Sequence, residues 1–179
     1  MPSHFFLSPF KRQGPLLLLD AVRQVLLLLG VFLALGAQGA SDIPVEQMVT
    51  SDFQSVREAV VEIIESDGLV VSAVIPFGRM LERTASSLGR AASPFAQLEI
   101  IQFCSAQLAW QLLEEDATQV ALCPLSITVF ATVNAPEQVV LAYRSPGATT
   151  PGRRKADELL RQIVHRAVLL SQPSPRMPH

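Results

Sequence analysis

The chain has 179 residues, of which 49% are hydrophobic, and its 14 basic and 16 acidic residues give a formal net charge of −2. Because nucleic acid is bound through clustered Lys and Arg, a mildly acidic chain without a basic stripe is a poor candidate for that partner. Its length suits one domain with a single core, once an N-terminal segment is set aside.

That N-terminal segment has the order of a secretory signal. Basic residues up to Arg23 come first, an apolar run from Val25 to Leu35 follows, and small residues close it at 36–40. We predict a signal peptide over residues 1–39 and a periplasmic or secreted protein. The alternative is an uncleaved anchor, which would be the only contact with a membrane. Cleavage removes three basic residues and one acidic residue, leaving 11 basic against 15 acidic residues, a charge of −4.

Residues 40–170 are expected to form one domain. Apolar residues recur at helical spacing between Ser51, the expected cap, and Asp67, and Gly68 suits a left-handed helix end. The segment 120–133 alternates after Pro124 as a half-buried strand does. In chain order we expect strands at 45–49, 69–75, 98–103, 120–133 and 139–143, helices at 51–67, 105–115 and 157–170, a short helix and a loop within 78–93, a linker at 146–154 and a disordered tail at 171–179. Strands mixed with helices, including one hairpin, predict a two-layer α+β fold with helices packed on a mainly antiparallel sheet.

The most reactive side chains of the expected domain are those of two cysteines, Cys104 and Cys123. Cys104 ends one expected strand and Cys123 lies early in the next, so they approach each other if those strands are neighbours. Three readings stay open: a structural disulfide, two buried free thiols, or a redox or ligand-binding pair in which the helix begun by Ser105 stabilises a thiolate at Cys104. The spacing is not that of a CxxC motif.

Other groups of polar residues give weaker indications of a functional site. Apart from the two thiols, the chain left after cleavage offers a zinc ion only His165 and His179. Met48 or Met80 are conceivable partners of the thiols for copper, and we expect no metal and no cofactor. The acidic run 114–116 reads as a solvated helix end. Arg144 could bind an anion together with the basic residues 153–155.

The segments 98–106, 120–127 and 140–144 together resemble the family described as domain of unknown function 302, over about Val45 to Leu170. Where many members have a Gly-Asn-Pro type segment, this chain has Gln102-Phe103-Cys104-Ser105, and it is more similar to a cysteine-bearing, exported branch associated with bacterial sulfur oxidation. The resemblance implies a compact α+β fold, a homodimer and no agreed catalytic activity.

Taken together, these features predict an exported domain that binds a small ligand or a periplasmic partner protein, accessory to sulfur redox metabolism. Its site would be lined by Phe103, Cys104, Ser105, Cys123, Pro124 and Arg144. One alternative is a thiol-based redox or sulfur-carrier protein, an enzyme with Cys104 as nucleophile and Cys123 as resolving thiol. The other is a structural dimer stapled by a disulfide.

Overall fold

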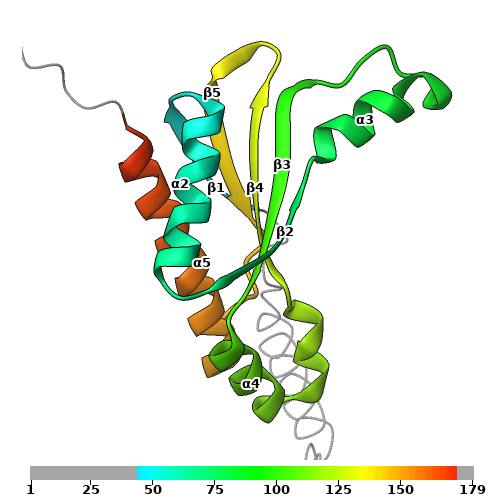
Figure 1. Ribbon diagram of the computed structural model, residues 1–179. Helices are drawn as coiled ribbons and strands as arrows, with labels where there is room; N and C mark the ends of the chain where they lie inside the picture. Colours follow the sequence, from blue (N-terminus) through cyan, green and yellow to red (C-terminus); the bar gives the residue numbers. More distant parts are fainter. Residues whose placement is uncertain (1–43, 173–179) are drawn as a thin grey trace, which may run out of the picture. The chain divides into compact units, whose positions relative to one another are not determined.

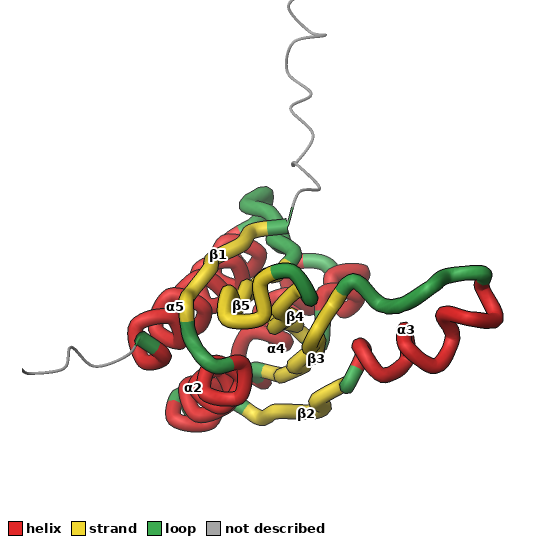
Figure 2. Tube along the Cα trace, turned by 90° about the horizontal axis from the view of Figure 1, so that it is seen from above, coloured by secondary structure: helices red, strands yellow, loops and turns green. Residues whose placement is uncertain are grey.

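A computed structural model of the protein describes residues 44–172. The predicted signal segment and most of the predicted tail lie outside these residues. Five antiparallel strands form one sheet in the order β1-β5-β4-β3-β2, with α2 and α5 against one of its faces (Figures 1 and 2). This confirms the predicted two-layer α+β fold. The elements are β1 (Val45–Thr50), α2 (Phe53–Ser66), β2 (Val70–Ile75), α3 (Phe77–Ala85), η1 (Ser86–Leu88), β3 (Phe95–Cys104), α4 (Ala106–Glu115), η2 (Ala117–Leu122), β4 (Leu125–Thr132), β5 (Ala135–Tyr143) and α5 (Pro151–Ser171).

The core lies between the sheet and the two long helices. Strand β4 shows why: its side chains alternate strictly between buried and half-buried, because successive residues point to opposite faces. The buried set of β4 packs with Ile101 and Phe103 of β3 and Leu141 of β5. Facing them are buried side chains of α2 and α5, such as Ile64 and Leu160. The opposite face of β4 carries Ser126, Thr128, Phe130 and Thr132.

Helix α2 connects the two edges of the sheet. It begins after β1 at one edge and leads into β2 at the other. Its N-cap is Asp52, whose carboxylate accepts from the Ser55 N–H at 2.9 Å, so the prediction of Ser51 as cap was wrong by one residue. Ser51 instead donates its hydroxyl to the carbonyl of Ser171 at 2.8 Å, joining the first strand to the end of α5. Gly68 ends the helix with φ +72°, as predicted.

Three predicted boundaries were wrong in the C-terminal half: the starts of β4 and α5, and that of β5, which begins at Ala135 and not at residue 139. The segment 117–122 is a 3-10 helix and not the start of a strand, because Asp116 caps it by accepting from the Thr118 N–H at 2.8 Å. Strand β4 therefore begins only at Leu125, after Pro124. Helix α5 begins six residues earlier than expected, with Pro151 in its first turn and Thr150 as N-cap. The expected linker is correspondingly shorter.

A polar cluster joins α4, η2 and the start of α5. At its centre Gln119 is only 2% exposed. Its amide donates to the Leu112 carbonyl at 3.0 Å, and its carbonyl accepts from the Arg153 Nε at 2.8 Å. Glu115 accepts from the Gly152 N–H at 2.7 Å, an N-terminal amide of α5. The acidic run therefore binds a helix N-terminus through Glu115, where the sequence had suggested a solvated end. The cluster thereby links the segment that connects β3 to β4 with the helix that follows β5.

Candidate functional site

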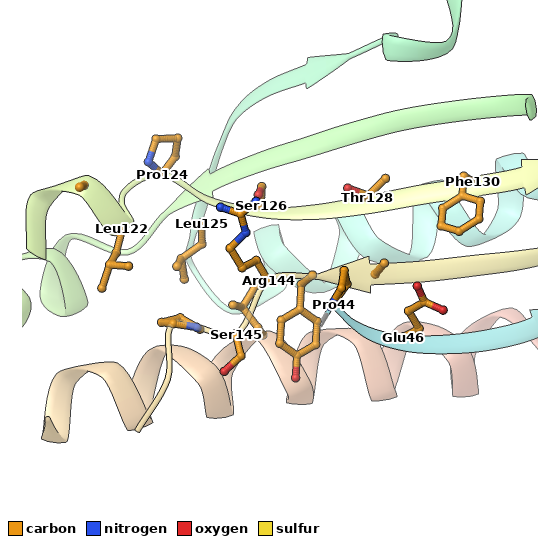
Figure 3. A pocket seen from close by; sticks show the side chains of 15 residues that line it. Pro44, Glu46, Leu122, Pro124, Leu125, Ser126, Thr128, Phe130, Arg144 and Ser145 are labelled. Carbon is orange, nitrogen blue, oxygen red and sulfur yellow. The ribbon is translucent and has the colours of Figure 1, made fainter. Parts of the chain in front are cut away.

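A hollow of about 610 Å³ lies over the sheet face that α2 and α5 leave open, and it continues round the end of the sheet to α5 (Figure 3). Its floor comes from β4 and β5, where strand alternation turns Ser126, Thr128, Phe130 and Ala142 away from the core. Its full lining is Pro44, Glu46, Ala121, Leu122, Pro124, Leu125, Ser126, Thr128, Phe130, Ala142, Tyr143, Arg144, Ser145, Pro146 and Leu160. The hollow thus combines apolar side chains with a few polar groups, as ligand sites commonly do.

Arg144 supplies the cationic group of the hollow. It follows Tyr143, the last residue of β5, and its side chain reaches across toward Ser126 on the neighbouring strand (Figure 3). Arg144 is exposed, and among residues 44–172 no carboxylate lies within ion-pair distance of its guanidinium. A guanidinium with free donors beside two hydroxyl-bearing residues is suited to a carboxylate, sulfonate or phosphate group.

Tyr143 points the other way and closes the wall of the hollow against α5. It is 4% exposed. Burial and the nearby carboxyl groups of Asp157 and Glu158 raise the pKa of its phenol, partly offset by Arg161. The Tyr143 phenol therefore stays protonated at neutral pH. The Asp157 Oδ1 atom, in turn, is buried and has no hydrogen-bond partner within the described residues.

The two cysteines come to the same end of the sheet as free thiols, and no disulfide joins them. Phe103 pairs with Leu125, so Cys104 comes next to Pro124, and Cys123 lies one residue beyond. Cys104 is exposed, whereas Cys123 is half-buried against the core. Burial raises the pKa of the Cys123 thiol, and negative charge at Cys104 raises it further. The segments that carry the two cysteines are therefore neighbours, but the environments of the two thiols differ.

The predicted site residues divide into two groups. Pro124 and Arg144 line the hollow. Phe103 is fully buried in the core, and Ser105 caps α4 by accepting from the Leu108 N–H at 3.3 Å. The cysteines lie beside the hollow without lining it. The residues that the prediction missed are Ser126, Thr128 and Phe130, whose signal was the outward half of the β4 alternation.

Neither a metal centre nor a membrane-crossing helix is found in residues 44–172. No three His, Cys, Asp or Glu side chains gather there as a metal ion would need. No helix of this part of the chain combines the length and apolar character needed to cross a bilayer.

Comparisons with known proteins extend the picture of the fold. The family described as "Domain of unknown function DUF302" matches residues 45–168. The crystal structure of an uncharacterised conserved DUF302 protein from Bacillus stearothermophilus is similar, with a TM-score of 0.51 and 15% sequence identity, over 74% of this chain and 97% of that one. At this identity the likeness shows the fold alone. No curated protein matches the chain significantly.

Proposed function

Since the chain belongs to the DUF302 family, whose description assigns no activity, we propose from its geometry that the domain binds a small ligand with an anionic head and an apolar body. The observation that carries this proposal is Arg144 in the hollow, with no carboxylate partner among the described residues. The ligand's anion would accept from the guanidinium, and its body would lie along Phe130 and Ala142.

The polar residues of the hollow support an anion at one end only. Ser126 places a hydroxyl group beside Arg144, and Thr128 places a second one further along β4, opposite Ala142 (Figure 3). Glu46, on β1, is another charged side chain of the lining and would repel a second anionic group. This charge arrangement favours a monoanion over a dianion that spans the hollow.

Benzenesulfonate is a suitable probe because it has one anionic group on an apolar ring. Isothermal titration should detect its binding, and Arg144→Gln should weaken the binding at least about tenfold, since a charge-assisted hydrogen bond contributes about 1.5–3 kcal/mol. Arg154→Gln is the matched control, because Arg154 donates to the Ala148 carbonyl and does not line the hollow. Equal affinity of the parent and the Arg144 variant would refute the proposal.

The chemical class of the anion can be narrowed in the same experiment. The resemblance to a branch associated with sulfur oxidation favours a sulfonate or thiosulfonate over a carboxylate, which makes an accessory role in sulfur metabolism the narrower form of the proposal. Benzoate and benzenesulfonate differ mainly in the head group, so their affinity ratio measures this preference. An affinity ratio near one would still agree with an anion site but would contradict the proposed role in sulfur metabolism.

A second candidate function is supported by the two neighbouring free thiols. With a small disulfide such as oxidised glutathione as oxidant, Cys104 would attack one sulfur and release one thiol, and Cys123 would then displace the second thiol. The protein loses two protons and two electrons, and the oxidant is reduced to two thiols. Mass spectrometry should show the chain lighter by two hydrogens. A stable glutathione adduct on Cys104, with Cys123 still free, would contradict the mechanism.

The remaining parts of the proposal concern location and assembly. The order of residues 1–39 supports export, which cell fractionation tests: a protein found only in the cytoplasm would contradict it.

A homodimer is supported by the family resemblance and by exposed apolar side chains on the open sheet face, such as Met48 of β1, which is 60% exposed. Light scattering after size exclusion gives the mass directly. A disulfide that staples the sheet would join Cys104 and Cys123 within one chain, so reduction would restore two free thiols without changing the mass of the dimer.

A further inference from the structure

Helix α4 is apolar on two opposite sides. Leu108 and Leu112 face the core and are buried. Trp110 and Leu113 lie on the other side and are 68% and 36% exposed. A helix with apolar residues on both sides normally has a partner on each. The neighbouring η2 adds Val120, which is 56% exposed. We call Trp110, Leu113 and Val120 the outer apolar surface. Within residues 44–172, no helix or strand covers it.

The position of this surface in the fold is informative. Residues Val45 and Tyr143 pair at the start of β1, and the last residues of β3 and the first of β4 extend beyond them at the same end of the sheet. Helix α4 begins directly after β3, so it lies at the end where the described chain begins, at Pro44 (Figure 1). The far end carries the β4–β5 turn and the end of α5.

The sequence before Pro44 indicates what lies near this end. The apolar run from Val25 to Leu35 is separated from Pro44 by only eight residues. Even fully extended, eight residues span at most about 29 Å. In the uncleaved form of the chain, whose apolar run stays in a bilayer, this end of the domain is confined to the neighbourhood of the lipid headgroups. Tryptophan is the residue most suited to that depth, because its ring is apolar and its N–H is polar.

We propose that the outer apolar surface of α4 and η2 docks on a lipid bilayer, with Trp110 at the headgroup level. The charges at this end decide the lipid preference. Arg154 and Lys155 in the first turns of α5 are exposed, and so are Glu114 and Asp116 at the end of α4. Since these charges oppose one another, the docking rests on apolar contact, and zwitterionic lipid is sufficient.

Trp110 is the only tryptophan of the chain and therefore reports on this surface alone. The full chain is reconstituted into phosphatidylcholine vesicles whose acyl chains are brominated, and Trp110 fluorescence is recorded. We expect emission at shorter wavelength and strong quenching by the bromine atoms, with little change when phosphatidylglycerol is added. In Trp110→Phe combined with Val133→Trp, the probe moves to the β4–β5 turn at the far end, and the same vesicles should leave it unquenched.

The double variant Leu113→Ser with Val120→Ser keeps Trp110 and removes its apolar neighbours, so the quenching should be lost or reduced several-fold. Two results would overturn the proposal. One is Trp110 emission that the brominated lipid does not quench. The other is a shift to shorter wavelength that grows with protein concentration in the absence of vesicles, because a second copy of the chain would then be the partner of this surface.

Discussion

Replacing Gln119 tests whether the polar cluster at the start of α5 contributes to stability. Gln119→Leu keeps the side-chain size but removes the acceptor of the Arg153 Nε and the donor to the Leu112 carbonyl. A hydrogen bond to a charged group contributes about 1.5–3 kcal/mol and a neutral one about 0.5–1.5 kcal/mol. Because Arg153 is partly exposed, water can accept from its Nε in the variant and offsets part of the lost hydrogen bond. We expect the free energy of unfolding to fall by about 2–3 kcal/mol.

Urea unfolding, followed by circular dichroism and by Trp110 fluorescence, measures this loss, provided that the m-value stays constant. Gln111→Leu is the matched control: Gln111 makes one long contact of 3.4 Å with Glu115 at the surface. It should change stability by less than about 0.5 kcal/mol. If Gln119→Leu were as stable as the control, the cluster would be a consequence of packing and not a source of stability.

Three further predictions concern the same end of the molecule. Gly152→Ala should lower the free energy of unfolding by about 1–2 kcal/mol in a thermal or urea assay, since an added Cβ would lie 2.8 Å from the Glu115 Oε2 and 3.0 Å from a Leu112 methyl. Unchanged stability would show that both side chains move aside freely. The pKa of Glu115 is lowered from its ordinary value of 4.5, by the Thr150 hydroxyl first and then, against burial, by the Gly152 N–H and the neighbouring glutamines. The destabilisation caused by Glu115→Gln should therefore be present at pH 7 and shrink as the pH falls through that lowered value, and a difference independent of pH would contradict the assignment. Iodoacetamide should modify the exposed Cys104 before Cys123. Cys104→Ser should speed the alkylation of Cys123 at a fixed alkaline pH, because it removes the charge that helps to raise the pKa of Cys123. An alkylation rate unaffected by the substitution would mean that the two thiols are uncoupled.

The sequence predicted the fold where a residue's neighbours along the chain decide its structure. Helix α2 was evident from its apolar spacing, and Gly68 from its place at the helix end. The η2 segment was misread because Val120, Ala121 and Leu122 continue the apolar pattern of β4, while the Asp116–Thr118 contact that coils them leaves no periodic signal. The start of α5 was missed because its first turns are polar and contain Pro151 and Gly152, although Thr150 before a proline is a typical helix start.

The candidate site was harder to predict, because it depends on which strands become neighbours. Arg144 was predicted from its place at the end of a strand, and Pro124 from its place next to Cys123. The role of Gln119 could not be foreseen, since its partners lie at Leu112, Thr150 and Arg153 and are assembled only by the tertiary fold. Ser126 and Thr128 were recognised as the outward half of a strand, but only the order β1-β5-β4 shows that Arg144 reaches across to Ser126 (Figure 3).

The order of the strands also constrains how the chain folds during synthesis. The first two strands to be made, β1 and β2, end as the outermost ribbons of the sheet, and every ladder that they join waits for β5 or β3. An N-terminal fragment ending at Ile75 therefore has no partner for either strand. Strand β2 can pair once β3 has been translated, but β1 must wait for β5, at residues 135–143, and such dependence on a distant pairing slows folding. The first strand of the domain is thus left unpaired until the last strand has been made.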